Sequence, residues 1–279
     1  MAKEFKLTAE NYHSVESNKR YCSKSQLLDF YGYDGCEARA LARINGEYEE
    51  PKSDALLIGS YVDCLLTEPD KVEKFISEHP EMISSRGTTK GLLKSEYQRA
   101  NVMVERVKQD KKMMQYLSGE SQVIMTGTIF GLPFKIKMDS YHPHKAIVDL
   151  KTVESLRKGY YIPERGRVSF VERFGYILQG AIYSEIVYQN TGERLPFLLA
   201  CVSKEPIPDI GLVWIDNQTL HDTIYGNELS EGIAKWCEQI MLLKRGEVEP
   251  IPCNHCAYCL PRKKIDKPIH YLELLGGLE

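Results

Sequence analysis

The chain has 279 residues and a formal net charge of −3, and 43% of its residues are hydrophobic and 27% charged. No run approaches the roughly 18 apolar residues that cross a bilayer, and the first residues lack the apolar core of a secretion signal. We therefore expect a globular cytoplasmic protein with no membrane partner. The charge balance also argues against a surface coated in positive charge.

The amino-terminal part is predicted to be helical after an irregular segment over residues 1–22. A helix is expected to begin within 23–30, with Ser23 or Ser25 as its N-cap, and to break between 31 and 35. Further helices are expected over 37–44, over 54–66 and, as one long charged amphipathic helix, over 90–117. The inward side of the long helix is expected to include Val102, Val107, Met113 and Met114.

A β-rich block is predicted next. Strands over 122–126, 134–140 and 146–152 are expected to form an antiparallel meander, with a hairpin loop over 140–145. The later elements are expected to be a helix over 168–190, strands over 197–203 and 211–215, and a helix over 219–245. This order of helix, three strands, helix and strand predicts an α/β fold with a central sheet flanked by helices.

Two acids and a lysine in this block are the most informative residues. Asp139 ends a strand of alternating apolar and polar residues, and Asp149 and Lys151 share one strand face, roughly 6.5–7 Å apart. An acid two residues before a lysine is common on solvated strands. Asp149, however, has apolar neighbours on both sides, and acids are rarely buried unless they are paired or bound to metal. Two acids that hold a divalent cation, beside a lysine that handles a water, suit metal-assisted phosphodiester hydrolysis.

Two helices carry further candidates. Asp63 lies in the apolar helix over 54–66, where it is either a metal ligand or an acid stabilised by the helix dipole. On the helix over 168–190, Gln179 offers both a donor and an acceptor. One face of this helix consists of Tyr176, Gln179, Gly180 and Tyr183. This face either packs into the core or forms part of the site.

Three of the eight cysteines, Cys253, Cys256 and Cys259, form a C-x2-C-x2-C motif. Without a secretion signal, a disulfide framework is not expected. The spacing predicts a zinc or iron–sulfur site, with Cys36 or His255 as the fourth ligand.

Basic side chains that could line a nucleic-acid groove are scattered along the chain. Each could equally be a solvated charge. They are Lys90, Lys94, Arg157, Lys158, Arg165, Arg167 and Arg173.

From about Tyr21 to the cysteine cluster, the chain resembles the PD-(D/E)xK nuclease superfamily, and within it the phage-type RecE-like (exonuclease VIII-like) exodeoxyribonucleases. Met138-Asp139 stands at the "PD" position and Asp149-Leu150-Lys151 at "(D/E)xK". Residues 59–63 resemble a helix that carries a metal-binding histidine in RecB-type nucleases, here replaced by Asp63. Residues 176–183 resemble the helix motif that positions DNA or water.

The resemblance implies a restriction-endonuclease-like core with a mixed sheet in αβββαβ order. It implies one domain over 1–279, with an amino-terminal helical segment to about 55 and a Cys-rich tail from about 247. Mg²⁺ or Mn²⁺ is then expected on Asp63, Asp139, Asp149 and the carbonyl of Leu150. The residues expected to catalyse are Asp139, Asp149, Lys151 and Gln179. Those expected to bind substrate are Gln179, Tyr183, Tyr176 and Arg173. In some members of the wider superfamily, an upstream cysteine placed like Cys36 joins three near the carboxyl terminus to hold a [4Fe–4S] cluster.

The function implied is Mg²⁺-dependent exodeoxyribonuclease activity on linear double-stranded DNA ends. The resemblance implies 5′→3′ polarity, phage-type recombination or repair with a single-strand annealing protein, and a homo-oligomeric ring. The chain lacks a G-x-x-x-x-G-K-[ST] loop, so we do not expect a helicase. Two alternatives stay open: a catalytically silent nucleic-acid-binding protein of this fold, and an interaction module built on the cysteines.

Overall fold

The computed structural model describes residues 5–50, 54–163, 165–228, 230–265, 267–268 and 270–271. Its centre is a five-stranded sheet in the order β1-β2-β3-β6-β7. The strands are β1 (Glu120–Ile129), β2 (Leu132–His142), β3 (Ala146–Val153), β6 (Phe197–Ser203) and β7 (Ile210–Ile215). Because β3 and β6 are parallel and the other neighbours antiparallel, the sheet is mixed, and the predicted meander of β1 to β3 is confirmed.

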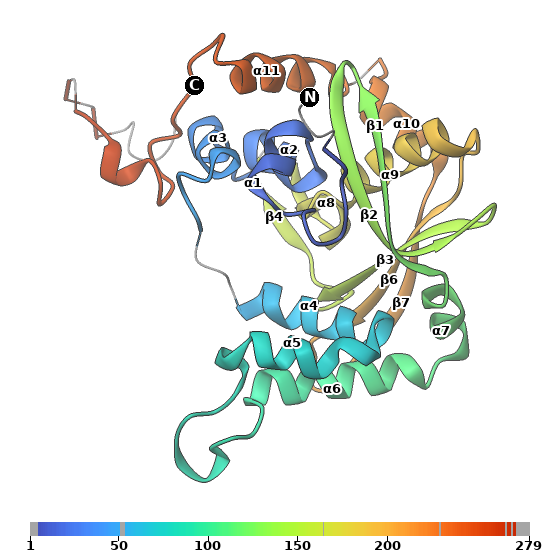
Figure 1. The fold of residues 1–279 in the computed structure, drawn as a ribbon. Helices are drawn as coiled ribbons and strands as arrows, with labels where there is room; N and C mark the ends of the chain where they lie inside the picture. The colour runs from blue at the N-terminus through green and yellow to red at the C-terminus, as the bar shows by residue number, and fades with distance from the viewer. Residues whose placement is uncertain are drawn as a thin grey trace.

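Helices cover both faces of this sheet (Figure 1). One face carries α4 (Asp54–Thr67), α5 (Val72–Glu78), α6 (Ser95–Lys108) and α7 (Lys111–Leu117). The other face carries α1 (Val15–Arg20), α2 (Lys24–Tyr31), α3 (Glu37–Asn45), α9 (Tyr176–Thr191), α10 (Asn217–Tyr225) and α11 (Ala234–Arg245). The fold is therefore the predicted restriction-endonuclease-like α/β core, and the predicted order of helix, three strands, helix and strand is confirmed.

The alternation of side chains along β3 builds two separate cores. Ile147 packs with Ile182 of α9 in one core, whereas Val148 and Leu150 pack with Val104 of α6 in the other. Successive strand residues point to opposite faces. The predicted division of β3 into two faces is therefore confirmed.

The helix starts and stops follow local chemistry at several predicted positions. The Ser23 hydroxyl accepts a hydrogen bond from the amide of Gln26 and caps α2. At the carboxyl end of α9, Gly192 has φ +77 and ends the helix, close to the predicted end at residue 190. A left-handed backbone conformation at the end of a helix costs little free energy for glycine, because glycine has no Cβ.

Two predictions about helices and one about an inward-facing side chain were wrong. The helix predicted over 90–117 is split because the Asp110 carboxylate caps α7 by accepting from the amides of Lys112 and Met113. Val102 is 51% exposed instead of facing inward, whereas Val107 and Met113 are buried. The segment predicted to be irregular contains α1, which Ser14 caps.

Two further predicted helices are also divided. The one over 168–190 becomes α8 (Phe170–Arg173) and α9, separated at Gly175 with φ +63. The one over 219–245 becomes α10 and α11, with left-handed glycines at Gly226 and Gly232 between them. Apolar periodicity continues through such breaks, so the pattern alone does not reveal them.

A two-stranded hairpin was missed by the sequence analysis. It consists of β4 (Tyr160–Ile162) and β5 (Gly166–Val168), follows β3, and lies beside α8 (Figure 1). Strands of three residues are too short to give an alternation signal. No helix in the described part of the chain has the length and apolarity needed to cross a bilayer. Parts of the predicted amino-terminal segment and tail, residues 1–4, 51–53 and 272–279, lie outside the described residues.

Candidate active site

Asp139 and Asp149 stand where β2 and β3 diverge. Pairing of these strands stops at Ser140 with Val148. The next pair in the same register is Asp139 and Asp149. In place of a further ladder bond, the amide of Leu150 donates to Asp139 Oδ2 at 2.8 Å. The carboxylate of one strand thus ties down the backbone of the other, and both acids are held at the opening between the strands.

Asp149 is the centre of the cluster. Its side chain is 2% exposed, and its Oδ1 accepts a 2.6 Å hydrogen bond from Nε2 of Gln179 on α9. Its Oδ2 is paired with the ammonium group of Lys151, yet accepts no directional hydrogen bond from the described residues. The charge of this buried oxygen is thus balanced by the Lys151 ammonium group.

Asp63 approaches this centre from α4, on the opposite side of the sheet from Gln179. Its carboxylate accepts hydrogen bonds from Thr67 Oγ1 at 3.2 Å and from Gln122 Nε2 at 3.1 Å. Burial and the nearby charge of Asp149 raise the pKa of Asp63 to about 6, against the smaller opposing effect of the Thr67 hydrogen bond. Burial and the charges of Asp149 and Asp63 also raise the pKa of Asp139 well above its usual value.

Gln122 is a site residue that the sequence analysis missed. It lies in β1 between Ser121, which pairs with Ser140, and Val123, which pairs with Met138. Gln122 itself has φ +55, a left-handed conformation that is uncommon for a non-glycine residue inside a strand. Local backbone strain of this kind is concentrated at functional sites. No motif marks the position, because only the paired register and the φ angle reveal it.

Two lysines share the ring of Tyr176. The ammonium nitrogens of Lys151 and Lys24 lie 4.9 Å and 5.0 Å from its centroid, and Lys24 also donates to the carbonyl oxygen of Phe174 at 2.9 Å. Burial and the charge of Lys151 lower the pKa of Lys24 to about 7. Burial acts to lower the pKa of Lys151 too, but the charge of Asp149 and other nearby negative groups outweighs it and raises that pKa. No pattern in the sequence predicts a role for Lys24, which lies in the Ser-Lys-Ser segment that begins α2.

The remaining predicted substrate residues have other contacts. Tyr183 is buried and its hydroxyl donates to the carbonyl oxygen of Lys137 at 2.9 Å, so it ties α9 to β2. Arg173 of α8 is paired with Asp34 at 3.2 Å and stacks over the ring of Tyr33. The structure therefore brings together the three acids, Lys151, Gln179 and Tyr176, whereas the described contacts of Arg173 lie elsewhere.

The donor set of the three acids fits a hard divalent cation. Carboxylate oxygens are the ligands that Mg²⁺ and Mn²⁺ prefer. The charge of Asp149 contributes to the raised pKa of both Asp63 and Asp139, so a compensating positive charge is required when all three acids are ionised. The ammonium group of Lys151 is paired with Asp149. The other donors to these two acids are uncharged: Leu150 N–H donates to Asp139, and Gln179 donates to Asp149. Asp63, Asp139 and Asp149 are thus suited to hold such an ion.

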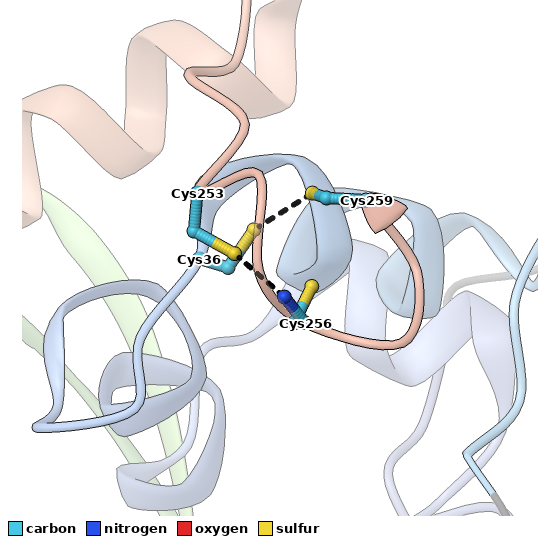
Figure 2. Close-up of side chains that lie close together, drawn as sticks. All are labelled: Cys36, Cys253, Cys256 and Cys259. Carbon is cyan, nitrogen blue, oxygen red and sulfur yellow. Dashed lines mark hydrogen bonds between the residues drawn. The ribbon is translucent and has the colours of Figure 1, made fainter. Parts of the chain in front are cut away.

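A second cluster joins the amino- and carboxyl-terminal parts of the chain (Figure 2). The sulfur atoms of Cys36, Cys253, Cys256 and Cys259 all lie within 4.8 Å of one another. Cys36 is the N-cap of α3, where its sulfur accepts from the amide of Arg39. His255, the alternative fourth ligand, instead places Nδ1 at 2.8 Å from the carbonyl oxygen of Cys253.

A mixed sheet whose diverging strands present two acids and a lysine is the arrangement of PD-(D/E)xK nucleases. Residues 23–262 match the family described as "PDDEXK-like domain of unknown function (DUF3799)", and the chain belongs to that family. A crystal structure from Eubacterium rectale, of a protein provisionally named an exonuclease, superposes with a TM-score of 0.89. It is 39% identical and covers 99% of this chain and 100% of its own. No curated protein matches the sequence. Together, the family and this relative support a nuclease.

Proposed function

We propose that the protein is a Mg²⁺-dependent exodeoxyribonuclease, of RecE-like type, that hydrolyses linear double-stranded DNA from its ends. The observation that carries this proposal is the convergence on Asp149 of Lys151, Gln179 and the diverging strand that bears Asp139. Sequence identity to the protein from Eubacterium rectale extends over the whole site-bearing region and supports the exonuclease assignment.

The side chains of the site divide the work of hydrolysis. Bound Mg²⁺ supplies a Lewis acid that polarises the scissile phosphate and its attacking water. Asp63, Asp139, Asp149 and the carbonyl of Leu150 are its proposed ligands. Lys151 orients the water and stabilises the charge that develops on the phosphate oxygens.

Two neighbours position this machinery. Gln179 fixes the rotamer of Asp149 through its 2.6 Å hydrogen bond. Lys24, whose ammonium nitrogen lies over the same Tyr176 ring as that of Lys151, adds a second positive charge when protonated and can then hold a phosphate of the same strand.

The finer features rest on the resemblance to RecE-like enzymes. They are 5′→3′ polarity, a product strand passed to a single-strand annealing protein in phage-type recombination, a homo-oligomeric ring, a cytoplasmic location and one nuclease domain over the whole chain. An exonuclease that leaves a long single strand requires a partner that uses it, and a ring would explain processive digestion.

The test is digestion of linear, end-labelled double-stranded DNA with Mg²⁺, beside a closed-circular control. We expect loss of the linear DNA only, with Asp149→Asn and Lys151→Met each reducing the rate by several orders of magnitude. Label release from one end gives the polarity. If no divalent ion supports cleavage by the wild type, the protein is the catalytically silent DNA-binding alternative. Unchanged rates in both variants would disprove the site.

We also propose that the four cysteines hold one zinc ion. A tetrahedral zinc with Zn–S bonds of about 2.3 Å places its sulfurs roughly 3.8 Å apart, which agrees with four atoms all within 4.8 Å. In a [4Fe–4S] cluster each thiolate binds one of the irons at alternate corners of a cube and points outward, so the cysteine sulfurs lie further apart than around one zinc ion. Burial acts to raise the pKa of Cys253, but hydrogen bonds from the amides of His255 and Cys256 outweigh it and lower that pKa to about 6. Cys253 therefore ionises readily to the thiolate that binds metal.

A further inference from the structure

The hairpin of β4 and β5 has one face in the protein and one in solvent. On the inner face, the Tyr160 ring packs against Phe174 at a centroid distance of 5.2 Å, and Val168 is buried. On the outer face, Tyr161 is 72% exposed and pairs in register with Arg167, which is also exposed. Side chains directly opposite each other on antiparallel strands are neighbours. An exposed ring and an exposed cation therefore stand side by side.

The outer face is built to keep Arg167 there. A Cβ on Gly159 would lie 2.0 Å from Nε of Arg167, so the absence of a side chain at Gly159 makes room for the arginine. No carboxylate among the described residues forms an ion pair with Arg167, although Arg165 nearby is paired with Glu172. Arg167 therefore has space beside Gly159 and has no ion-pair partner in the part of the chain that the structure describes.

Charge around the hairpin is opposite in sign to that of the whole chain. Residues 157–168 contain four basic side chains and one acidic one, whereas the chain has a net charge of −3. The basic residues are Arg157, Lys158, Arg165 and Arg167. Three of them are paired with acids outside this segment: Arg157 with Asp209, Lys158 with Glu154 and Arg165 with Glu172. Arg167 is therefore the basic side chain whose charge is left for a phosphate.

Aromatic contacts connect the hairpin to the candidate active site. The ring of Tyr160 meets that of Phe174, whose centroid is 6.0 Å from that of Tyr176. Tyr176 in turn holds the ammonium group of Lys151 at 4.9 Å from its centroid. Two ring contacts therefore separate the inner face of the hairpin from Lys151, so the hairpin lies close to the candidate active site.

We infer that the outer face of this hairpin binds the unpaired strand of DNA next to the cleaved end, with a base stacked on Tyr161 and a phosphate on Arg167. This inference rests on the proposed nuclease function for its substrate. Stacking on an exposed ring needs a free base face, which a duplex buries between its own base pairs, so the occupant is single-stranded. An arginine beside the ring adds both charge and a planar surface.

The experiment measures the anisotropy of a labelled oligothymidylate and of a blunt duplex of equal length, without added divalent cation so that neither is cleaved. Tyr161→Ser should weaken binding of the single strand by about tenfold, Tyr161→Phe should leave it near wild type, and Arg167→Gln should weaken it and reduce its salt dependence. Duplex binding should change little with Tyr161→Ser. The matched controls are Trp214→Ser, an exposed ring on β7, and Lys145→Gln, an exposed cation in the turn before β3.

The outcomes separate this inference from the proposed function. If the wild type cleaves DNA but Tyr161→Ser binds the single strand as tightly as wild type, the hairpin inference is overturned and the nuclease stands. Equal loss with Trp214→Ser also overturns it. If no divalent ion supports cleavage and yet Tyr161→Ser loses single-strand binding, the hairpin inference stands and the nuclease proposal fails. Circular dichroism of each variant verifies that these exposed substitutions leave the fold intact.

Discussion

Gln179 donates its Nε2 hydrogen to Oδ1 of Asp149 at 2.6 Å, and this contact links α9 to the centre of the sheet. Both residues are buried. The bond uses one carboxylate oxygen and leaves the other beside Lys151, so the orientation of the acid is fixed before any ligand binds. A residue that acts in this way positions the acid and need not contact the substrate.

Replacing Gln179 with leucine is expected to reduce the rate of DNA hydrolysis by about 10–100-fold and to raise the Mg²⁺ concentration needed for half-maximal rate. The reason is that Asp149 loses the donor that holds its rotamer. The measurement is the initial rate on linear duplex DNA across a Mg²⁺ titration. Gln189→Leu is the matched control, because Gln189 lies on the same helix but bonds Thr128 and Glu185. Identical Mg²⁺ curves for the two variants would contradict a positioning role.

The strand patterns were sufficient to predict the strands of the sheet and the two acids on them, and the family resemblance implied that the sheet is mixed. Alternation along β3 predicts that Ile147 and Val148 lie on opposite faces of the sheet, and the two cores confirm it. Side-chain periodicity is a local property of a strand, so it can be read without the fold.

The parts that could not be predicted depend on contacts between distant segments. Gln122 acquires its contact with Asp63 because β1 turns into a left-handed conformation opposite Asp139, and no pattern in the sequence specifies that φ. Lys24 meets Tyr176 across about 150 residues of chain. The helix breaks at Asp110 and Gly175 were missed because apolar spacing continues past them.

Lys24→Met is expected to weaken binding of duplex DNA by roughly tenfold and to lower the slope of log affinity against log salt by about one. The reason is that one cation near the cleaved strand is lost while its alkyl packing is kept. Binding is measured by anisotropy without added divalent cation at several salt concentrations. Lys145→Met should leave both quantities unchanged. A Lys24 variant with wild-type affinity and salt slope would exclude a phosphate contact.

Asp63→His is expected to retain part of the hydrolysis rate with Mn²⁺ and to lose most of it with Mg²⁺. Imidazole is a good ligand for Mn²⁺ relative to Mg²⁺, which prefers oxygen. The measurement is the ratio of rates with the two ions, compared between wild type and variant. An unchanged ratio would mean that Asp63 does not touch the metal.

Cys256→Ala is expected to abolish zinc binding and to lower the Tm by roughly 5–10 °C, because the ion joins the start of α3 to the tail. The measurement is zinc content by elemental analysis together with calorimetry, on protein purified without chelator. Cys64→Ala is the control, since Cys64 is a buried cysteine outside the cluster. If the wild type contains iron and acid-labile sulfide, with a visible absorption that is lost in Cys256→Ala, the site holds an iron–sulfur cluster and not zinc.

Lys135 provides a prediction about stability that is independent of catalysis. Its ammonium group is buried under α1, where it donates to the Tyr12 carbonyl, Ser17 Oγ and Asn18 Oδ1. Burial, with a smaller effect of Lys244, lowers its pKa to about 8 from the usual value near 10.5. Between about pH 8 and 10.5, the unfolded chain therefore binds more protons at this residue than the folded protein does. The folded state must gain stability at Lys135 as pH rises through that window.

The wild type should consequently gain on the order of 2 kcal/mol of unfolding free energy relative to Lys135→Met between pH 8 and 10.5, and nothing between pH 6 and 8. Urea unfolding of both proteins at each pH gives this difference, in which all groups common to the two cancel. Lys145→Met, at an exposed position, should run parallel to wild type throughout. If the Lys135→Met curve is parallel as well, the ammonium group titrates alike in the folded and unfolded chains, and burial beneath α1 does not destabilise its charged form.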